Sequence, residues 1–287
     1  MEKPPAGRVA LVLSVGILAV STAGTLVRLL PAEHPLVIAF WRVLIVAVLL
    51  APGIRRVSAR DLAFTMGGGL FLALHFWAWF ASLQLTTVMR STLLVCLTPV
   101  WVGLFEGVFL GSPPPRRFWI GSAAALFGVI VMAAPAASAG TASLSGDGLA
   151  VLGGVLSASY FTIGRSVRAR VPIQSYGPLS CGATALWLGL LALGSGVPLA
   201  PTAPSAWWPI LGLALGPQLL GHVGFSYAVG RLAASTVAGV ILLEPVGATA
   251  VAALVLGEHP RWFEVVGGLI TLAGVAVAVV PKRAPRD

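Results

Sequence analysis

Two histidines stand in long apolar stretches of this 287-residue chain, and their type and spacing suit binding chemistry. His75 and His222 are 147 residues apart, as are Phe80 and Tyr227, so the two stretches are related. An imidazole can bind a carboxylate or carry a proton. We therefore expect both rings to face a central cavity; the alternative is that each ring bonds a neighbouring helix and only fixes packing.

An acidic residue in the second stretch adds a different kind of chemistry. Glu244 lies near the middle of an apolar run, where an ionised carboxylate costs roughly 2.5–3.5 kcal/mol on insertion scales. Pro245 follows it and removes a backbone donor, which opens the helix locally. The pair suits a site for a cation or amine, or a proton carrier. A hydrogen-bond anchor at a kink is the equal alternative.

Aromatic and amide side chains complete the set of candidates. They suit stacking on an aromatic ring or an ammonium group, with plain helix packing as the alternative. The predicted substrate-binding residues are His75, Trp79, Trp101, Tyr160, Gln218, His222, Tyr227 and Glu244. Arg42 could clamp a substrate carboxylate, but fold support, by pairing with Glu33 or capping a helix end, is the preferred interpretation. Glu106 is closer to a run end and is expected to snorkel there.

The same spacing recurs along much of the chain. Equivalent residues lie 146 apart in one part and 137 apart in another: Pro99 and Pro245, Gly111 and Gly257, Gly121 and Gly267, Gly128 and Gly274, and, at the shorter spacing, Pro35 and Pro172. We therefore interpret the chain as an internal duplication. The predicted repeats are residues 1–140 and 141–287, joined through a small polar linker at 136–146.

The composition requires lipid as the solvent. Hydrophobic residues make up 57% of the chain and charged residues only 9%, against about 25% charged in soluble domains. The net charge of +9 sits in short clusters between apolar runs, as in membrane loops, and no nucleic-acid-binding motif is present. Cys96 and Cys181 have neither metal-site spacing nor a plausible disulfide framework. We expect no cofactor, no metal and no nucleic-acid partner.

Ten apolar runs are long enough to cross a bilayer, which takes roughly 20 helical residues. They are approximately 9–30, 35–53, 62–84, 91–110, 117–135, 147–167, 172–194, 206–228, 233–256 and 262–281. Their continuous rather than alternating hydrophobicity excludes a β-barrel. The first run ends without a small-residue cleavage site, so we interpret it as a retained span.

The basic residues orient these spans. With the N-terminus in the cytoplasm, 14 of the 18 Lys and Arg residues fall in cytoplasmic segments. The chain is therefore predicted to be a multi-pass protein of the cytoplasmic (inner) membrane with both termini cytoplasmic. Five spans per repeat, an odd number, place the two copies in opposite orientations. We predict an all-α integral membrane protein of two inverted five-helix repeats around a central cavity, an architecture typical of transporters, with Pro99 and Pro245 as hinges.

Several short motifs point to a family. They are Phe40-Trp41-Arg42, Phe80-Ala81-Ser82-Leu83, Thr98-Pro99-Val100, Tyr227-Ala228, Glu244-Pro245-Val246 and Leu256-Gly257-Glu258. With these motifs the chain resembles the drug/metabolite transporter superfamily of the EamA type, and within it looks most like the YddG-type exporters of aromatic amino acids. The first copy departs from the pattern, because Ser112 rather than Glu follows Gly111. The resemblance implies a basket of helices around a cavity, with outward flow of substrate.

The expected function is secondary transport rather than catalysis. We predict an exporter of amino acids, aromatic ones above all, and of related small metabolites, working by alternating access. One chain of ten helices suffices to enclose the cavity, which is compatible with a monomer, although the sequence leaves the oligomeric state open. The expected partners are a small-molecule substrate and the bilayer. The alternatives are an exporter of drugs or other metabolites, a scaffold subunit, and an intramembrane enzyme built on Ser195, for which no paired histidine is evident.

Overall fold

The chain is helical along nearly all of the length that a computed structural model describes, namely residues 6–86, 88–137, 143–256 and 260–279. The α-helices are α1 (Ala6–Ser21), α2 (Ala23–Arg28), α3 (Pro35–Leu50), α4 (Ala59–Leu85), α5 (Val88–Val95), α6 (Thr98–Leu110), α7 (Arg116–Ala137), α8 (Leu144–Arg168), α9 (Ile173–Gly194), α10 (Trp207–Leu213), α11 (Gly224–Val229), α12 (Ala234–Ile241), α13 (Glu244–Leu256) and α14 (Trp262–Val279). Short 3-10 turns are η1 (Ala51–Gly53) and η2 (Pro204–Ala206), and η3 (Ala214–Val223) is a π-helix.

Nine of the ten predicted spans appear as stretches long and apolar enough to cross a membrane, among the described residues. The tenth, predicted at 206–228, is helical throughout but changes type, because α10 passes into the π-helix η3 and then into α11. Pro217 lies inside this π-helix. A proline ring clashes with the carbonyl four residues earlier, so a wider turn relieves the helix. The all-α membrane fold is confirmed, and the change of helix type within this span is a feature that the sequence analysis did not predict.

Three other spans are broken in the middle. The breaks between α5 and α6 and between α12 and α13 come just before Thr98-Pro99 and Glu244-Pro245, so both prolines stand second in their helices, where a missing N–H costs little. The break between α1 and α2 was not predicted. There the Ser21 and Thr22 hydroxyls donate to backbone carbonyls at 2.8 and 2.7 Å, a bond that bends helices.

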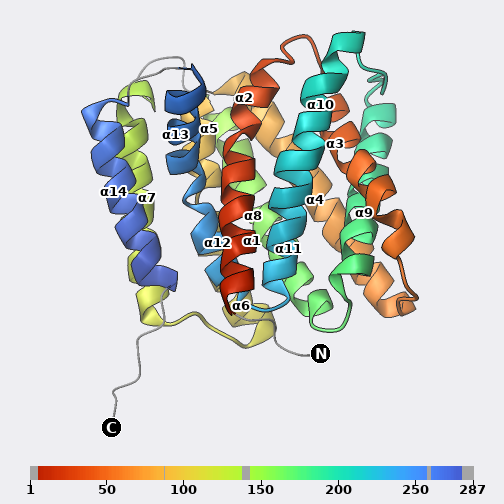
Figure 1. The fold of residues 1–287 in the computed structure, drawn as a ribbon, viewed down its shortest axis with the longest axis horizontal. Helices are drawn as coiled ribbons and strands as arrows, with labels where there is room; N and C mark the ends of the chain where they lie inside the picture. Colours follow the sequence, from red (N-terminus) through yellow and green to blue (C-terminus); the bar gives the residue numbers. More distant parts are fainter. Residues whose placement is uncertain (1–5, 87, 138–142, 257–259, 280–287) are drawn as a thin grey trace.

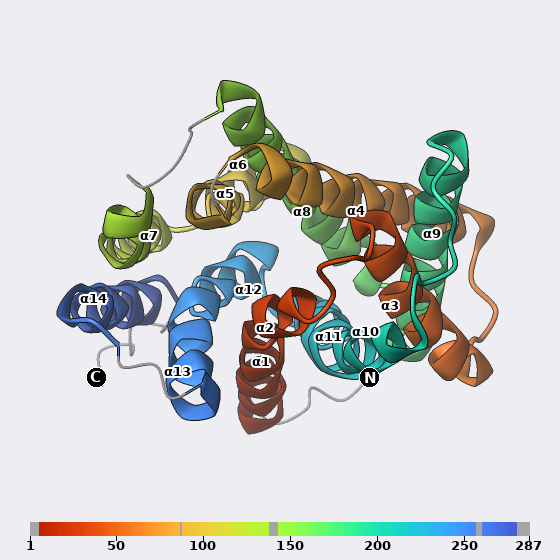
Figure 2. The same ribbon diagram turned by 90° about the horizontal axis from the view of Figure 1, so that it is seen from above.

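The contact between α7 and α14 demonstrates that the repeats are inverted. Seen from above, these helices lie side by side at one end of the molecule, and α3 and α9 at the other (Figure 2). A Cβ at Gly121 would lie 2.5 Å from the Gly274 oxygen, and one at Gly128 would lie 2.5 Å from the Gly267 oxygen. Gly121 thus contacts Gly274, which is the repeat equivalent of Gly128, and Gly128 contacts Gly267, which is the repeat equivalent of Gly121. This exchange is the mark of a two-fold axis between antiparallel copies.

Both ends of the described chain lie on one side of the bundle. In Figure 1, α1 begins and α14 ends at the same end of the helices. An even number of crossings requires this. Which side of the membrane this end faces stays a prediction, as does the repeat boundary between residues 140 and 141, which lies outside the described residues.

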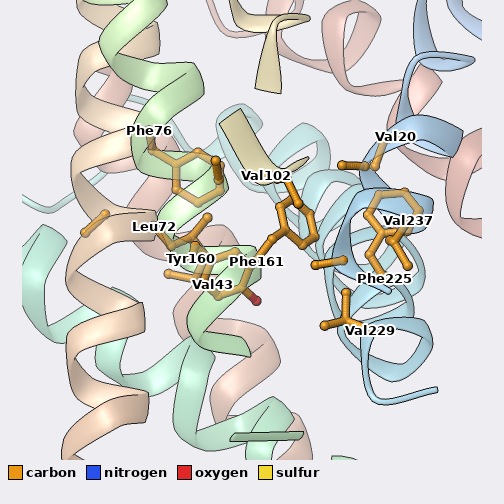
Figure 3. Packing of buried hydrophobic residues seen from close by; sticks show 14 of the residues in the cluster. Val20, Val43, Leu72, Phe76, Val102, Tyr160, Phe161, Phe225, Val229 and Val237 are labelled. Carbon is orange, nitrogen blue, oxygen red and sulfur yellow. The ribbon is translucent and has the colours of Figure 1, made fainter. Parts of the chain in front are cut away.

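The interior packs across the two rows of helices that Figure 2 shows. Phe76 and Leu72 of α4 lie on one side of the central cluster and Phe225 of α11 on the other, with Phe161 of α8 between them (Figure 3). Outward side chains are apolar too, and residues such as Leu254 (87% exposed) and Val108 (74%) would face lipid.

Glu106 provides one of the polar contacts between the repeats. Glu106 of α6 is 2% exposed, and its two carboxylate oxygens accept the backbone N–H groups of Ala234 and Ser235 at 2.6 and 3.0 Å. The expectation that Glu106 snorkels to the surface is therefore wrong. The free N–H groups at the start of α12 attract the carboxylate inward instead.

Candidate functional site

The π-helix η3 carries two of the predicted substrate-binding residues, Gln218 and His222. Long π-helices are rare, and π-turns occur frequently at functional sites. No helical period in the sequence reveals this change, although Pro217 between two glycine-flanked apolar segments marks its position. The wider turn alters the direction in which the following side chains point.

Arg42 of α3 is held beside this π-helix. Its Nε and Nη2 atoms donate to Gln218 Oε1 at 3.1 and 2.9 Å, and its guanidinium carbon lies 4.5 Å from the centre of the Phe76 ring. Arg42 is 3% exposed. The expected pairing with Glu33 is wrong, because Glu33 instead accepts hydrogen bonds from Thr202 near the end of the bundle. A buried guanidinium that donates only to a neutral amide within the described chain keeps its full charge for another partner.

His75 of α4 is engaged with the neighbouring helix. Its Nδ1 lies 2.8 Å from the Gly153 carbonyl oxygen of α8, so this nitrogen carries the hydrogen, and the residue is 7% exposed. The ring also stacks on Trp79 with a centroid distance of 6.2 Å. These contacts agree with the packing interpretation of His75, and its role in substrate binding stays a prediction.

His222 has a different environment. Its ring is half-buried and meets Phe76 in a T-shaped contact with 5.6 Å between centroids. Its Nδ1 is shielded from solvent without a hydrogen-bond partner among the described residues. His222 and Arg42 therefore both contact the Phe76 ring, a residue that the sequence analysis did not select.

Two tryptophans show the same lack of a partner. The Nε1 atoms of Trp79 and Trp101 are buried without a hydrogen bond in the described part of the chain. Trp79 lies against Gly153 of α8, and Thr98, one turn before Trp101, lies against Gly154. Trp79 and Thr98 thus lie against the same turn of α8. Buried donors without acceptors favour a ligand that supplies acceptors.

Glu244 begins α13 at the break in its span. Its backbone oxygen accepts a hydrogen bond from Ser21 of α1 at 3.3 Å, but its carboxyl group has no hydrogen bond or ion pair with the described residues. Arg42 lies within electrostatic range of this carboxyl group. An acid and a base thus lie inside the spans without a direct ion pair between them in the described part of the chain.

The two tyrosines among the predicted binding residues, Tyr160 and Tyr227, each contact another side chain of the protein. Tyr160 is 4% exposed and its hydroxyl bonds the Ser226 hydroxyl at 2.9 Å, which joins α8 to α11. The guanidinium carbon of Arg231 lies 3.7 Å from the centre of the Tyr227 ring. Among the described side chains, neither Tyr160 nor Tyr227 contacts His75 or His222 in these interactions. Their role in binding stays a prediction.

Two shallow apolar grooves of about 350 and 330 Å³ lie on the outer face by α9. The first runs between α3, α4 and α9, and the second between α3 and α9; none of the predicted site residues lines them. Their exposed leucines, such as Leu186 and Leu190, indicate a lipid-facing surface. The central cavity and the hinge roles of Pro99 and Pro245 stay predictions.

Comparison with known proteins places this geometry in a family. The model of the EamA-like transporter family matches residues 7–134 and again 144–280. A protein of Streptantibioticus cattleyicolor named "Probable terminal-alkyne amino-acid exporter" is 34% identical over 197 residues, 64% of this chain and 62% of that relative. An "Uncharacterized transporter" of Archaeoglobus fulgidus is 26% identical over 211 residues, 71% of each chain. The matched stretch of the first relative is thus under two thirds of its length.

A solved crystal structure extends the comparison to the whole fold. It aligns over 96% of this chain and 98% of its own length with a TM-score of 0.81, at 19% sequence identity. At that identity the likeness concerns the fold alone. The two family matches fall on the two halves of the inverted repeat, and the chain belongs to the EamA-like transporter family.

Proposed function

We propose that this protein is a secondary transporter that exports amino acids, preferentially aromatic ones, and related small metabolites across the cytoplasmic membrane. The relative named as an amino-acid exporter supports the substrate class. Alternating access between the repeats 1–140 and 141–287 would proceed by rocking at the breaks before Pro99 and Pro245.

The observation that carries the proposal is the pair of opposite charges inside the spans. Arg42 has no carboxylate partner, and the Glu244 carboxyl group has no hydrogen bond or ion pair among the described residues. Charged groups inside a membrane are costly and mark substrate paths. A zwitterionic amino acid would present its carboxylate to the guanidinium and its ammonium group to Glu244, while the rings of Phe76, Trp79 and Trp101 would contact an aromatic side chain.

Counterflow into proteoliposomes tests the proposal. Labelled aromatic amino acids should accumulate, and unlabelled amino acid should compete better than its N-acetyl derivative, which lacks the ammonium group. Glu244→Gln should remove this preference, whereas the control Glu264→Gln, at the exposed start of α14, should keep it. Equal competition by hydrophobic cations and no uptake of amino acids would instead support the alternative, an exporter of drugs.

A further inference from the structure

The two histidines are equivalent in the repeat but not in their surroundings. Gly16 of α1 and Gly153 of α8 are 137 residues apart, the spacing that also relates Pro35 to Pro172. Helix α1 packs on η3 and α11 as α8 packs on α4. The bond from His75 to the Gly153 carbonyl therefore predicts an equivalent bond from His222 to the Gly16 carbonyl. That bond is absent in the described structure, where His222 Nδ1 has no partner.

The π-helix accounts for the difference. His75 lies in α4, which is a regular α-helix along its whole length, whereas His222 lies in the last turn of η3. The wider turns of η3 rotate the residues that follow Pro217 away from the direction that an α-helix would give them. Helix α1 remains in close contact, because a Cβ at Gly16 would lie 3.3 Å from the Leu220 oxygen. The imidazole of His222 is thus released although the two helices stay together.

The released imidazole lies in a setting suited to an anion. Neither of its nitrogens has a hydrogen bond with a described residue. The Phe76 ring contacts both His222 and the Arg42 guanidinium, so a positive charge lies nearby. Arg42 Nη1 has no hydrogen bond in the described chain either. An imidazole donor and a free guanidinium donor beside one aromatic ring can share a carboxylate.

We propose that the duplicated histidines have separate roles: His222 and Arg42 bind the carboxylate of the exported molecule, while His75 is a positioning residue that holds α4 against α8. This assignment rests on the proposed amino-acid export and adds which end of the substrate meets which helices. His222 thereby determines specificity for the carboxylate. The ammonium group of the substrate would then bind Glu244 at the start of α13, while its carboxylate binds His222 of η3 and Arg42 of α3.

The test compares an amino acid with its carboxamide, which keeps the size and the ammonium group but lacks the negative charge. The inhibition constants of both compounds are measured against counterflow of the labelled amino acid in wild type, His222→Leu, His222→Gln and His75→Leu. Wild type should prefer the carboxylate by about tenfold or more, since hydrogen bonds to charged groups are the stronger ones. His222→Leu should reduce this ratio by about tenfold, and His222→Gln, which keeps a donor, should reduce it less.

The matched variant His75→Leu should lower the thermal midpoint and weaken both compounds by the same factor, leaving the ratio unchanged. An altered ratio in His75→Leu, or an unaltered one in His222→Leu, would overturn the division of roles. If His222→Leu does not fold, the ratio in His222→Gln decides, because the glutamine keeps the volume and polarity of the site. Wild-type protein that moves no amino acid at all would refute the proposed function itself.

Discussion

At the scale of single residues, the partners of a buried polar group separate structural from functional roles. Glu106 has both oxygens satisfied by the first N–H groups of α12, so its charge is fully used within the fold. By contrast, His222 Nδ1 and the indole Nε1 atoms of Trp79 and Trp101 are buried without a hydrogen-bond partner among the described residues. Since unsatisfied buried groups cost about 1–3 kcal/mol each, their persistence favours a ligand-binding role.

Glu106 gives a prediction at this scale. Glu106→Gln removes the charge and one acceptor oxygen from two buried N–H groups, which should destabilise the protein by about 1.5–3 kcal/mol. Thermal unfolding in detergent measures the effect. Glu264→Gln alters a comparable but exposed bond, from the Arg261 N–H to Glu264 at 2.6 Å, and should cost about 1 kcal/mol or less. Equal shifts of the two midpoints would contradict a special role for the tie between α6 and α12.

At the scale of elements, the π-helix η3 sets the direction of His222. Pro217→Ala restores a backbone N–H and removes the ring that clashes in an α-helix, so we expect η3 to relax toward α-helix and the protein to become more stable. His222 would then turn toward Gly16, and KM for the substrate should rise by about tenfold with the loss of one charged hydrogen bond. Pro178→Ala, in the regular helix α9, is the matched control and should leave KM unchanged. If Pro217→Ala stabilises the protein but leaves KM unchanged, the π-helix is not required for substrate binding.

The pairing of α7 with α14 is the closest backbone approach between two elements that the glycines allow. An alanine at Gly121 would overlap the backbone of Ala278 and the Gly274 oxygen, neither of which can move alone. Gly121→Ala should therefore destabilise the protein by about 1–3 kcal/mol or prevent its folding. Gly24→Ala in α2 meets nothing within 4 Å and should be neutral or slightly stabilising. Comparison of the folded yields and thermal midpoints of the two variants checks this.

At the scale of the whole molecule, the features carried by periodicity and composition could be predicted from the sequence. The duplication, the helical class and the breaks at Pro99 and Pro245 follow from spacing, hydrophobicity and proline chemistry. The partner of Arg42 could not be predicted, because Gln218 lies 176 residues away and only the folded arrangement brings them together. The different environments of His75 and His222 were also hidden, since equivalent positions in a repeat suggest equal roles until a change of helix type separates them.

The orientation of the molecule gives a further prediction. The distribution of Lys and Arg predicts that both termini are cytoplasmic, and α1 begins on the same side as α14 ends (Figure 1). A fluorescent protein fused to the C-terminus should therefore fluoresce, and alkaline phosphatase fused there should be inactive. The opposite pair of results would invert the direction of transport as well as the topology.

The glycine exchange between α7 and α14 has a consequence for assembly. Because Gly121 meets Gly274 while Gly128 meets Gly267, this seam has the self-complementary form of a homodimer interface within one polypeptide. Covalent continuity at 138–142 should then be dispensable. Two fragments, 1–139 and 140–287, produced together in one cell should find each other in the bilayer and co-purify, and Gly121→Ala in the first fragment should abolish their reunion.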